Sequence, residues 1–91
     1  MNKEQLVNAI AERAGLTKKD ANAALEAFVN TVEQAVANGS KVQLVGFGSF
    51  EVRQRSARRG RNPQTGAELE IPATKVPAFK PGHTFKALVK D

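Results

Sequence analysis

Apolar side chains in the amino-terminal part of the chain follow the spacing of amphipathic helices. Asn2 followed by Gln5 offers a helix N-cap with a capping-box partner. Apolar residues then recur at helical intervals from Leu6 to about Ala14, and we expect Gly15 to end this helix.

A second, longer helix is predicted after a tight turn. Thr17 with Asp20 three residues later suits its start, and Gly39 stands where a left-handed C-terminal stop is needed. One apolar stripe runs along this helix and consists of Ala21, Ala24, Leu25, Phe28, Val29, Val32, Ala35 and Val36.

After the second helix, apolar residues alternate with polar ones, which is typical of β-strands. Val42 and Leu44 belong to one alternating segment, and a corner at residues 46–48 leads to Phe50 and Val52 in the next. This spacing predicts a hairpin.

The second strand of the hairpin continues beyond Arg53, but its apolar residues disappear. Leu69 and Ile71 alternate with acids in a returning strand. The turn residues expected between the two strands are Gly60, Asn62, Pro63 and Gly66. The pattern predicts a two-stranded arm over about residues 53–75. Because this ribbon has no core to face, we expect it to be mobile without a partner.

The chain then returns in a third strand that contains Val76 and Phe79. Pro72 and Pro77 limit this strand to a sheet edge or a bulge, because proline cannot donate to a ladder. A short last helix is predicted after Gly82.

These elements predict one α+β domain over residues 1–91, because so short a chain leaves too little material for two separate cores. Residues 1–39 are its helical dimerisation part, and residues 40–91 hold a three-stranded antiparallel sheet, the arm and a short C-terminal helix. The five phenylalanines fall at interior positions and exceed what so small a body needs, so we expect a dimer interface. Its predicted core comprises Phe28, Val32, Leu44, Phe47, Phe50 and Phe79.

The net charge of +5 is unevenly distributed along the chain. Residues 1–50 hold five basic and five acidic residues, whereas residues 51–91 hold nine basic residues against four acids. This segregation indicates a polyanion-binding surface on a neutral scaffold.

Five arginines lie within nine residues of the predicted arm, with no acid among them. They are Arg53, Arg55, Arg58, Arg59 and Arg61. A guanidinium group donates paired hydrogen bonds to phosphate and enters a narrow, electronegative minor groove. The alternative is a solvated charged surface. An unpaired, all-arginine run on a strand without a core favours DNA binding.

Pro63 lies at the predicted tip of the arm. A proline at a ribbon tip serves turn formation, or it acts as an apolar wedge that unstacks base pairs. The pattern alone leaves both interpretations open.

The residue inventory argues against catalysis, metal binding and cofactors. The chain has no cysteine, and the single histidine, His83, cannot assemble a zinc centre or activate a thiol. No carboxylate pair stands out, so we expect no catalytic residue, no metal site and no cofactor. The charged amino terminus and the absence of a long apolar run predict a soluble intracellular protein without a membrane partner.

The hairpin and the arm resemble the signature of the bacterial HU family of histone-like proteins. The segments that carry the resemblance are Gly46-Phe47-Gly48-Ser49-Phe50, Arg55, Arg58, Gly60 and Arg61-Asn62-Pro63-Gln64-Thr65-Gly66. Further matches are Met1-Asn2-Lys3, Leu44-Val45-Gly46, Ile71-Pro72-Ala73 and Val76-Pro77-Ala78-Phe79. The resemblance therefore spans essentially the whole chain.

The resemblance implies an intertwined homodimer with a helical base, a saddle of strands and two arms that wrap duplex DNA through the minor groove. It also implies that the arm arginines contact the DNA and that the tip proline intercalates, which favours the wedge. These roles fall on Arg53, Arg55, Arg58, Arg61, Asn62 and Pro63. Phosphate contacts at the saddle and flanks fall on Lys3, Lys75, Lys80 and Lys86.

One position departs from the family pattern, which commonly has lysine where this chain has His83. An unperturbed histidine gains charge below about pH 6.5, so one hypothesis makes His83 a pH-dependent phosphate contact. The alternative is a solvent-facing residue at the start of the last helix.

The resulting prediction is a nonspecific architectural protein of the bacterial cytoplasm and nucleoid that wraps, bends and compacts duplex DNA. Bent, nicked or damaged DNA should be preferred, because deforming it costs less. Three alternatives stay open: a site-specific subunit of the integration host factor type, an RNA-binding protein, and a heterodimer with a paralogue.

Overall fold

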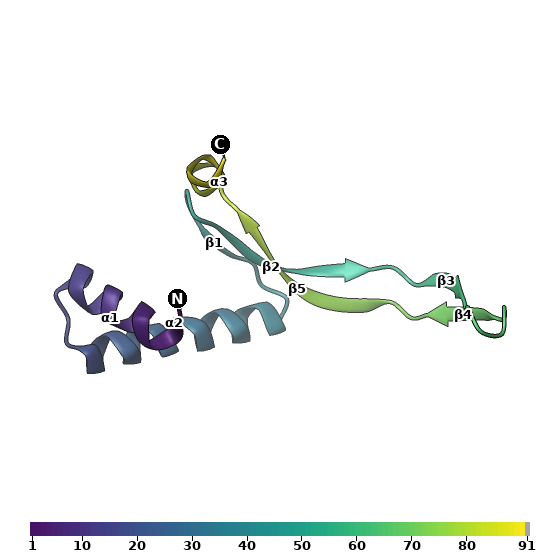
Figure 1. Ribbon diagram of the computed structural model, residues 1–91, viewed down its shortest axis with the longest axis horizontal. Helices are drawn as coiled ribbons and strands as arrows, with labels where there is room; N and C mark the ends of the chain where they lie inside the picture. Colours follow the sequence, from purple (N-terminus) through teal and green to yellow (C-terminus); the bar gives the residue numbers. More distant parts are fainter. Residues whose placement is uncertain (91) are drawn as a thin grey trace. The chain divides into compact units, whose positions relative to one another are not determined.

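The computed structural model describes residues 1–90 as two compact units, Met1–Gln34 and the chain from Ala35 onward (Figure 1). In chain order the elements are α1 (Lys3–Ala14), α2 (Lys18–Ala37), β1 (Val42–Leu44), β2 (Gly48–Arg55), β3 (Arg58–Arg61), β4 (Glu68–Ile71), β5 (Thr74–Pro81) and α3 (His83–Val89). These helices and antiparallel strands confirm the α+β class. That residues 1–91 form one domain stays a prediction, and its last residue, Asp91, lies outside the described part.

Both ends of α1 form as the sequence predicts. The Asn2 side chain accepts a hydrogen bond from the Gln5 backbone N–H at 2.9 Å. The Gln5 side chain accepts one in return from the Asn2 N–H at 3.0 Å, which completes the capping box. Gly15 ends the helix at φ 68°, a left-handed conformation that glycine adopts without strain.

The start of α2 is also fixed by a local side chain. The Thr17 hydroxyl accepts a hydrogen bond from the Asp20 backbone N–H at 3.1 Å, as an N-cap does. At the other end Gly39 has φ 85°, and the N–H of Ser40 donates to the Ala35 carbonyl at 2.8 Å. This bond satisfies a carbonyl group that the helix end would otherwise leave without a donor.

The core of the first unit is small. Val7 and Ala11 of α1 and Ala21 of α2 are buried, with Ile10 and Leu25 packed against them. Several larger apolar side chains remain 38–44% exposed, namely Leu6, Leu16, Phe28 and Val29. The helix pair therefore leaves much of its apolar surface uncovered.

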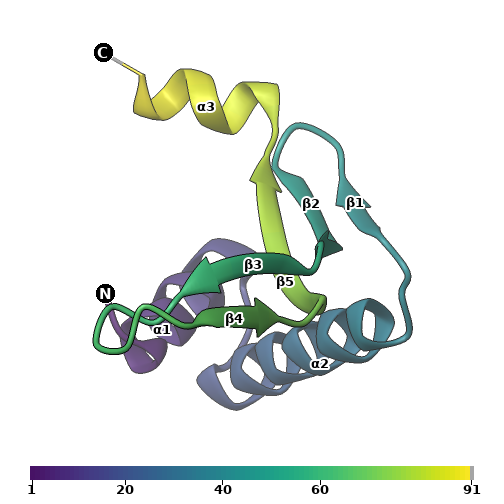
Figure 2. The ribbon, with the colours of Figure 1, turned by 90° about the vertical axis from the view of Figure 1, so that its right-hand side faces the viewer.

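In the second unit β1, β2 and β5 form a three-stranded antiparallel sheet with β2 in the centre (Figure 2). β1 and β2 form the predicted hairpin, in which Val42 lies opposite Phe50. β5 is an edge strand, as its prolines predict, and Pro77 lies opposite Val52.

β3 and β4 pair as the predicted two-stranded arm ribbon (Figure 2). Arg55 lies opposite Thr74 and Arg58 lies opposite Ile71, so the register of β2 and β5 carries over into β3 and β4. Two positions on each strand separate the two ladders, and one of them is Pro72. Because proline has no N–H to donate, the ladder is interrupted there while its register is kept.

Gly60 was expected in the turn, and this prediction is wrong. It lies within β3 opposite Leu69, and the turn begins at Asn62, whose N–H donates to the Ala67 carbonyl at 2.9 Å. The strand pairing on both sides of Gly60 overrides the local turn tendency of glycine.

α3 confirms the predicted last helix, and its start is attached to the corner between β1 and β2. The Gly82 N–H donates to the Phe47 carbonyl at 2.8 Å, and the Phe85 N–H donates to the Gly46 carbonyl at 3.2 Å. The rings of Phe47 and Phe85 stack with centroids 5.4 Å apart. Phe47 nevertheless stays 44% exposed and Phe79 36% exposed, so the chain alone does not cover these rings.

Candidate nucleic-acid interface

The arm ribbon has two chemically different faces, because opposite residues of an antiparallel pair share a face. The charged arm face consists of Arg59, Arg61, Glu68 and Glu70. The apolar arm face consists of Arg58, Gly60, Leu69 and Ile71. A Cβ added to Gly60 would lie 3.6 Å from the Ile71 side chain, in agreement with this assignment. The acids of the ribbon therefore share a face with Arg59 and Arg61.

The sequence-based expectation that all arm arginines are unpaired is wrong at Arg59. Its Nη1 lies 3.7 Å from Oε2 of Glu68, and both side chains are largely exposed. An exposed pair of this kind contributes only about 0.2–1 kcal/mol. Within residues 1–90, no ion pair involves the other four, Arg53, Arg55, Arg58 and Arg61.

Hydrogen bonds within the tip hold its backbone around an exposed Pro63. Asn62 Oδ1 accepts from the Gln64 N–H at 2.9 Å, which forms a side-chain turn over the proline. The Gly66 N–H donates to the Asn62 carbonyl at 2.7 Å. Pro63 therefore stands at the end of the arm in a locally fixed loop, and its environment is compatible with both turn formation and a wedge.

The sheet register brings several predicted contact residues together. In the β2–β5 pair Ser49 lies opposite Lys80 and Arg53 lies opposite Val76. The basic sheet face, as we call it, consists of Ser49, Glu51, Arg53, Arg55, Thr74, Val76, Ala78 and Lys80. Lys75 lies opposite Gln54 and therefore on the other face of the pair. The structure thus groups Arg53, Arg55 and Lys80 and separates Lys75 from them.

The basic sheet face also contains an acid, Glu51. Its Oε1 lies 3.4 Å from Nζ of Lys80 and is inaccessible to solvent. The Glu51 side chain is 23% exposed, whereas that of Lys80 is 60% exposed. Sequence reasoning missed this pair, because the strand register that joins the two residues cannot be read from local spacing.

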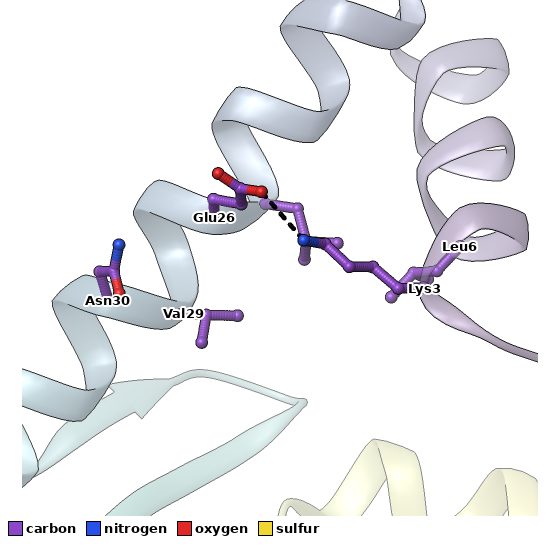
Figure 3. Close-up of a pocket in the computed structure, with 6 residues that line it drawn as sticks. Lys3, Leu6, Glu26, Val29 and Asn30 are labelled. Carbon is purple, nitrogen blue, oxygen red and sulfur yellow. Dashed lines mark hydrogen bonds and ion pairs between the residues drawn. The ribbon is translucent and has the colours of Figure 1, made fainter.

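Lys3 belongs to the first unit, where it pairs with an acid of α2. Its Nζ lies 2.9 Å from Glu26 Oε1, and both residues line a groove of about 440 Å³ (Figure 3). Hydrogen bonding to Lys3, its positive charge and a hydrogen bond from Asn22 lower the pKa of Glu26 below its usual 4.5. Leu6 and Val29 line the groove.

His83 and Lys86 lie on α3. His83 is the first residue of this helix and is exposed, which both interpretations of this residue require. Lys86 is exposed in the last turn, where a cation interacts favourably with the helix dipole. Both residues belong to the second unit, as the arm does.

The six residues predicted for a dimer core are all incompletely buried. Leu44, Phe47 and Phe79 are 36–44% exposed in the second unit. Phe50 is half-buried, with its ring centroid 4.9 Å from that of Phe79. In the first unit Phe28 is 42% exposed and Val32 is half-buried.

Within residues 1–90 no group of three or more His, Cys, Asp or Glu side chains is placed to hold a metal ion. None of the helices in that range combines the length and apolar character that a membrane crossing requires.

Comparisons with known proteins agree over almost the full length. The family model described as "Bacterial DNA-binding protein" matches residues 1–90. "DNA-binding protein HU" of Geobacillus stearothermophilus is 61% identical over 90 residues, which cover 99% of this chain and all of that protein. "DNA-binding protein HU 1" of Bacillus subtilis is 61% identical over 98% of this chain and 97% of its own length. Among solved structures, the "Anabaena HU-DNA cocrystal structure" has a TM-score of 0.87 at 57% identity, covering 98% of this chain and 97% of that one.

Proposed function

Because the chain belongs to the bacterial DNA-binding protein family, we propose that it is an architectural protein that binds, bends and compacts duplex DNA with little regard for sequence. The observation that carries this proposal is the exposed run of arginines along β2 and β3, in which Arg53, Arg55, Arg58 and Arg61 have no ion-pair partner within residues 1–90. The DNA backbone supplies the counter-charge that these residues lack. Phosphate contacts carry no sequence information, so binding is nonspecific.

The geometry supports different roles for the arginines and for Pro63. The arginines bind along the groove and backbone, and exposed Pro63 at the fixed tip loop is the wedge between base pairs. Unstacking one step costs a few kcal/mol, which is offset by the wider contact that a kinked duplex allows. Flexible, nicked or already bent DNA is therefore bound most tightly.

We propose that the binding form is a homodimer. The aromatic cluster around Phe47 and Phe79 and the apolar groove beside Leu6 and Val29 are left partly uncovered by the chain itself. A second copy covers such surfaces and supplies the second arm. A paralogue with the same surfaces would pair in the same way.

The test is gel-shift binding and end-to-end fluorescence transfer on short duplexes with the purified protein. We expect similar affinities for unrelated sequences, tighter binding to nicked duplexes, and an affinity that falls steeply with salt. Matched double-stranded RNA is the control and should bind more weakly. A strong preference for one site, or equal binding of RNA, would contradict the proposal.

The bend is tested separately with Pro63→Ala. Removal of the wedge should reduce the bend angle more than the affinity, because the arginine contacts remain. Thr65→Ala is the matched control at the tip, since it removes the hydrogen bond that the Thr65 hydroxyl accepts from the Ala67 N–H but keeps the proline. Equal bend angles for Pro63→Ala and the parent protein would refute the wedge.

Since the related proteins are named for DNA binding, the role we propose is non-catalytic and located in the cytoplasm with the nucleoid. Assays of this role measure the bending and compaction of DNA, and we expect no turnover of a substrate.

A further inference from the structure

Glu51 is the one acid in the three strands β1, β2 and β5. The register places it on the basic sheet face, between the positions of Lys80 and Arg53. A phosphate that approaches this face therefore comes near a largely covered carboxylate. A surface that only maximised attraction to DNA would have a neutral or basic residue at this position.

The carboxylate of Glu51 interacts electrostatically with the ammonium group of Lys80. Within residues 1–90 its Oε1 has no hydrogen-bond partner and is inaccessible to water, and the Lys80 Nζ lies 3.4 Å away. An ion pair with one largely covered member is screened less than a pair in open solvent. The negative charge therefore acts mainly on Lys80, whose own side chain remains 60% exposed.

We propose that Glu51 is a built-in counter-ion, which holds Lys80 partly neutralised and thereby limits how many phosphates each chain neutralises. This inference rests on the proposed function. It makes Glu51 a positioning residue that acts through Lys80 without touching DNA. The consequence is weaker and less salt-sensitive binding than the count of basic residues implies, which favours release from nonspecific sites.

The experiment is a double-mutant cycle with Glu51→Gln, Lys80→Gln and both together. The measurement is the slope of log affinity against log salt on one short duplex. Each neutralised phosphate contributes about 0.9 to this slope. Glu12→Gln, which removes an exposed acid of α1, controls for the change in net charge.

We expect Glu51→Gln to bind more tightly with a steeper slope. The affinity gap to the parent should widen about 3.5-fold for each fourfold dilution of salt per added phosphate contact. Lys80→Gln should lower the slope by clearly less than about 0.9 per chain in the parent, and by about that amount in the Glu51→Gln background.

An unchanged slope in Glu51→Gln would overturn the inference. The inference would also be overturned if Glu51→Gln steepened the salt slope equally with and without Lys80, or if Glu12→Gln steepened it by the same amount. In either case the negative charge would act on DNA generally. If Glu51→Gln does not fold, the salt slope of Lys80→Gln is the test. A decrease of about 0.9 per chain in this slope contradicts the proposal, and a smaller decrease supports it. Absence of salt-dependent duplex binding by the parent would instead refute the proposed function.

Discussion

Arg58 and Arg59 are neighbours in sequence, yet the ribbon gives them different surroundings. Arg58 lies opposite Ile71 on the apolar arm face, and Arg59 pairs with Glu68 on the charged arm face. A cation that already has an acid beside it adds less to phosphate binding than one that has none.

We therefore expect Arg58→Ala to weaken DNA binding more than Arg59→Ala. The salt slope should fall by about 0.9 per chain for Arg58→Ala and by less for Arg59→Ala. Fluorescence anisotropy titrations on one duplex at four salt concentrations measure both. Identical slopes for the two variants would mean that the Glu68 pair does not persist on DNA.

Glu26 gives the fold a pH dependence through its pair with Lys3. Because the folded-state pKa of Glu26 is lowered, its contribution to stability is fully present above its usual pKa of 4.5 and is lost as the pH falls through the lowered value. Urea midpoints measured from pH 7 to pH 3 should therefore differ between the parent and Glu26→Gln at neutral pH and converge in acid. Glu12→Gln, an exposed acid without an ion pair within residues 1–90, should show no such convergence. A constant gap between parent and Glu26→Gln would exclude this linkage.

At the level of elements, the start of β2 depends on a close approach of two backbones. A Cβ on Gly48 would lie 2.5 Å from the Lys80 carbonyl oxygen, and its φ of 154° is strained for other residues. Gly48→Ala should lower the free energy of unfolding by about 1–3 kcal/mol, as measured by denaturant titration.

Gly60→Ala is the matched control, since a Cβ there meets Ile71 at an ordinary 3.6 Å. It should change the free energy of unfolding by less than about 0.5 kcal/mol. Equal losses for both variants would show that the difference in strand propensity between glycine and alanine, not the close approach of the backbones, determines the effect of Gly48→Ala.

The sequence predicted the elements where local chemistry decides them. Asn2 and Gln5 start α1, and Gly15 ends it, through bonds between residues that are close in sequence. The pairs Arg59–Glu68 and Lys80–Glu51 could not be predicted, because each depends on which residues become diagonal neighbours across two strands. The roles of the predicted contact residues stay predictions, since their identity follows from composition and resemblance and their DNA contacts are a matter for experiment.

For the whole molecule, the partial exposure of Phe28, Phe47 and Phe79 predicts that stability depends on a partner. If two chains fold together, the Tm rises with protein concentration, because mass action favours the associated state. Differential scanning calorimetry over a hundredfold concentration range should show this shift. Phe47→Asp should abolish it and yield a monomer by light scattering, whereas Leu88→Asp, at an 81% exposed position of α3, should retain it. A Tm independent of concentration in the parent would argue against the dimer.

The interruption at Pro72 leaves the pairing of the outer ribbon in step with that of the sheet. A pivot at this point can change the direction of the tip but cannot exchange the side of the ribbon that carries Arg58 for the side that carries Arg59. One extra residue inserted before Arg58 in a single strand would move Arg58 and Arg59 to each other's side of the ribbon, because successive side chains of a strand point to opposite faces. Natural lengthening or shortening of such arms should therefore proceed by whole pleats, with matched additions of two residues on both strands.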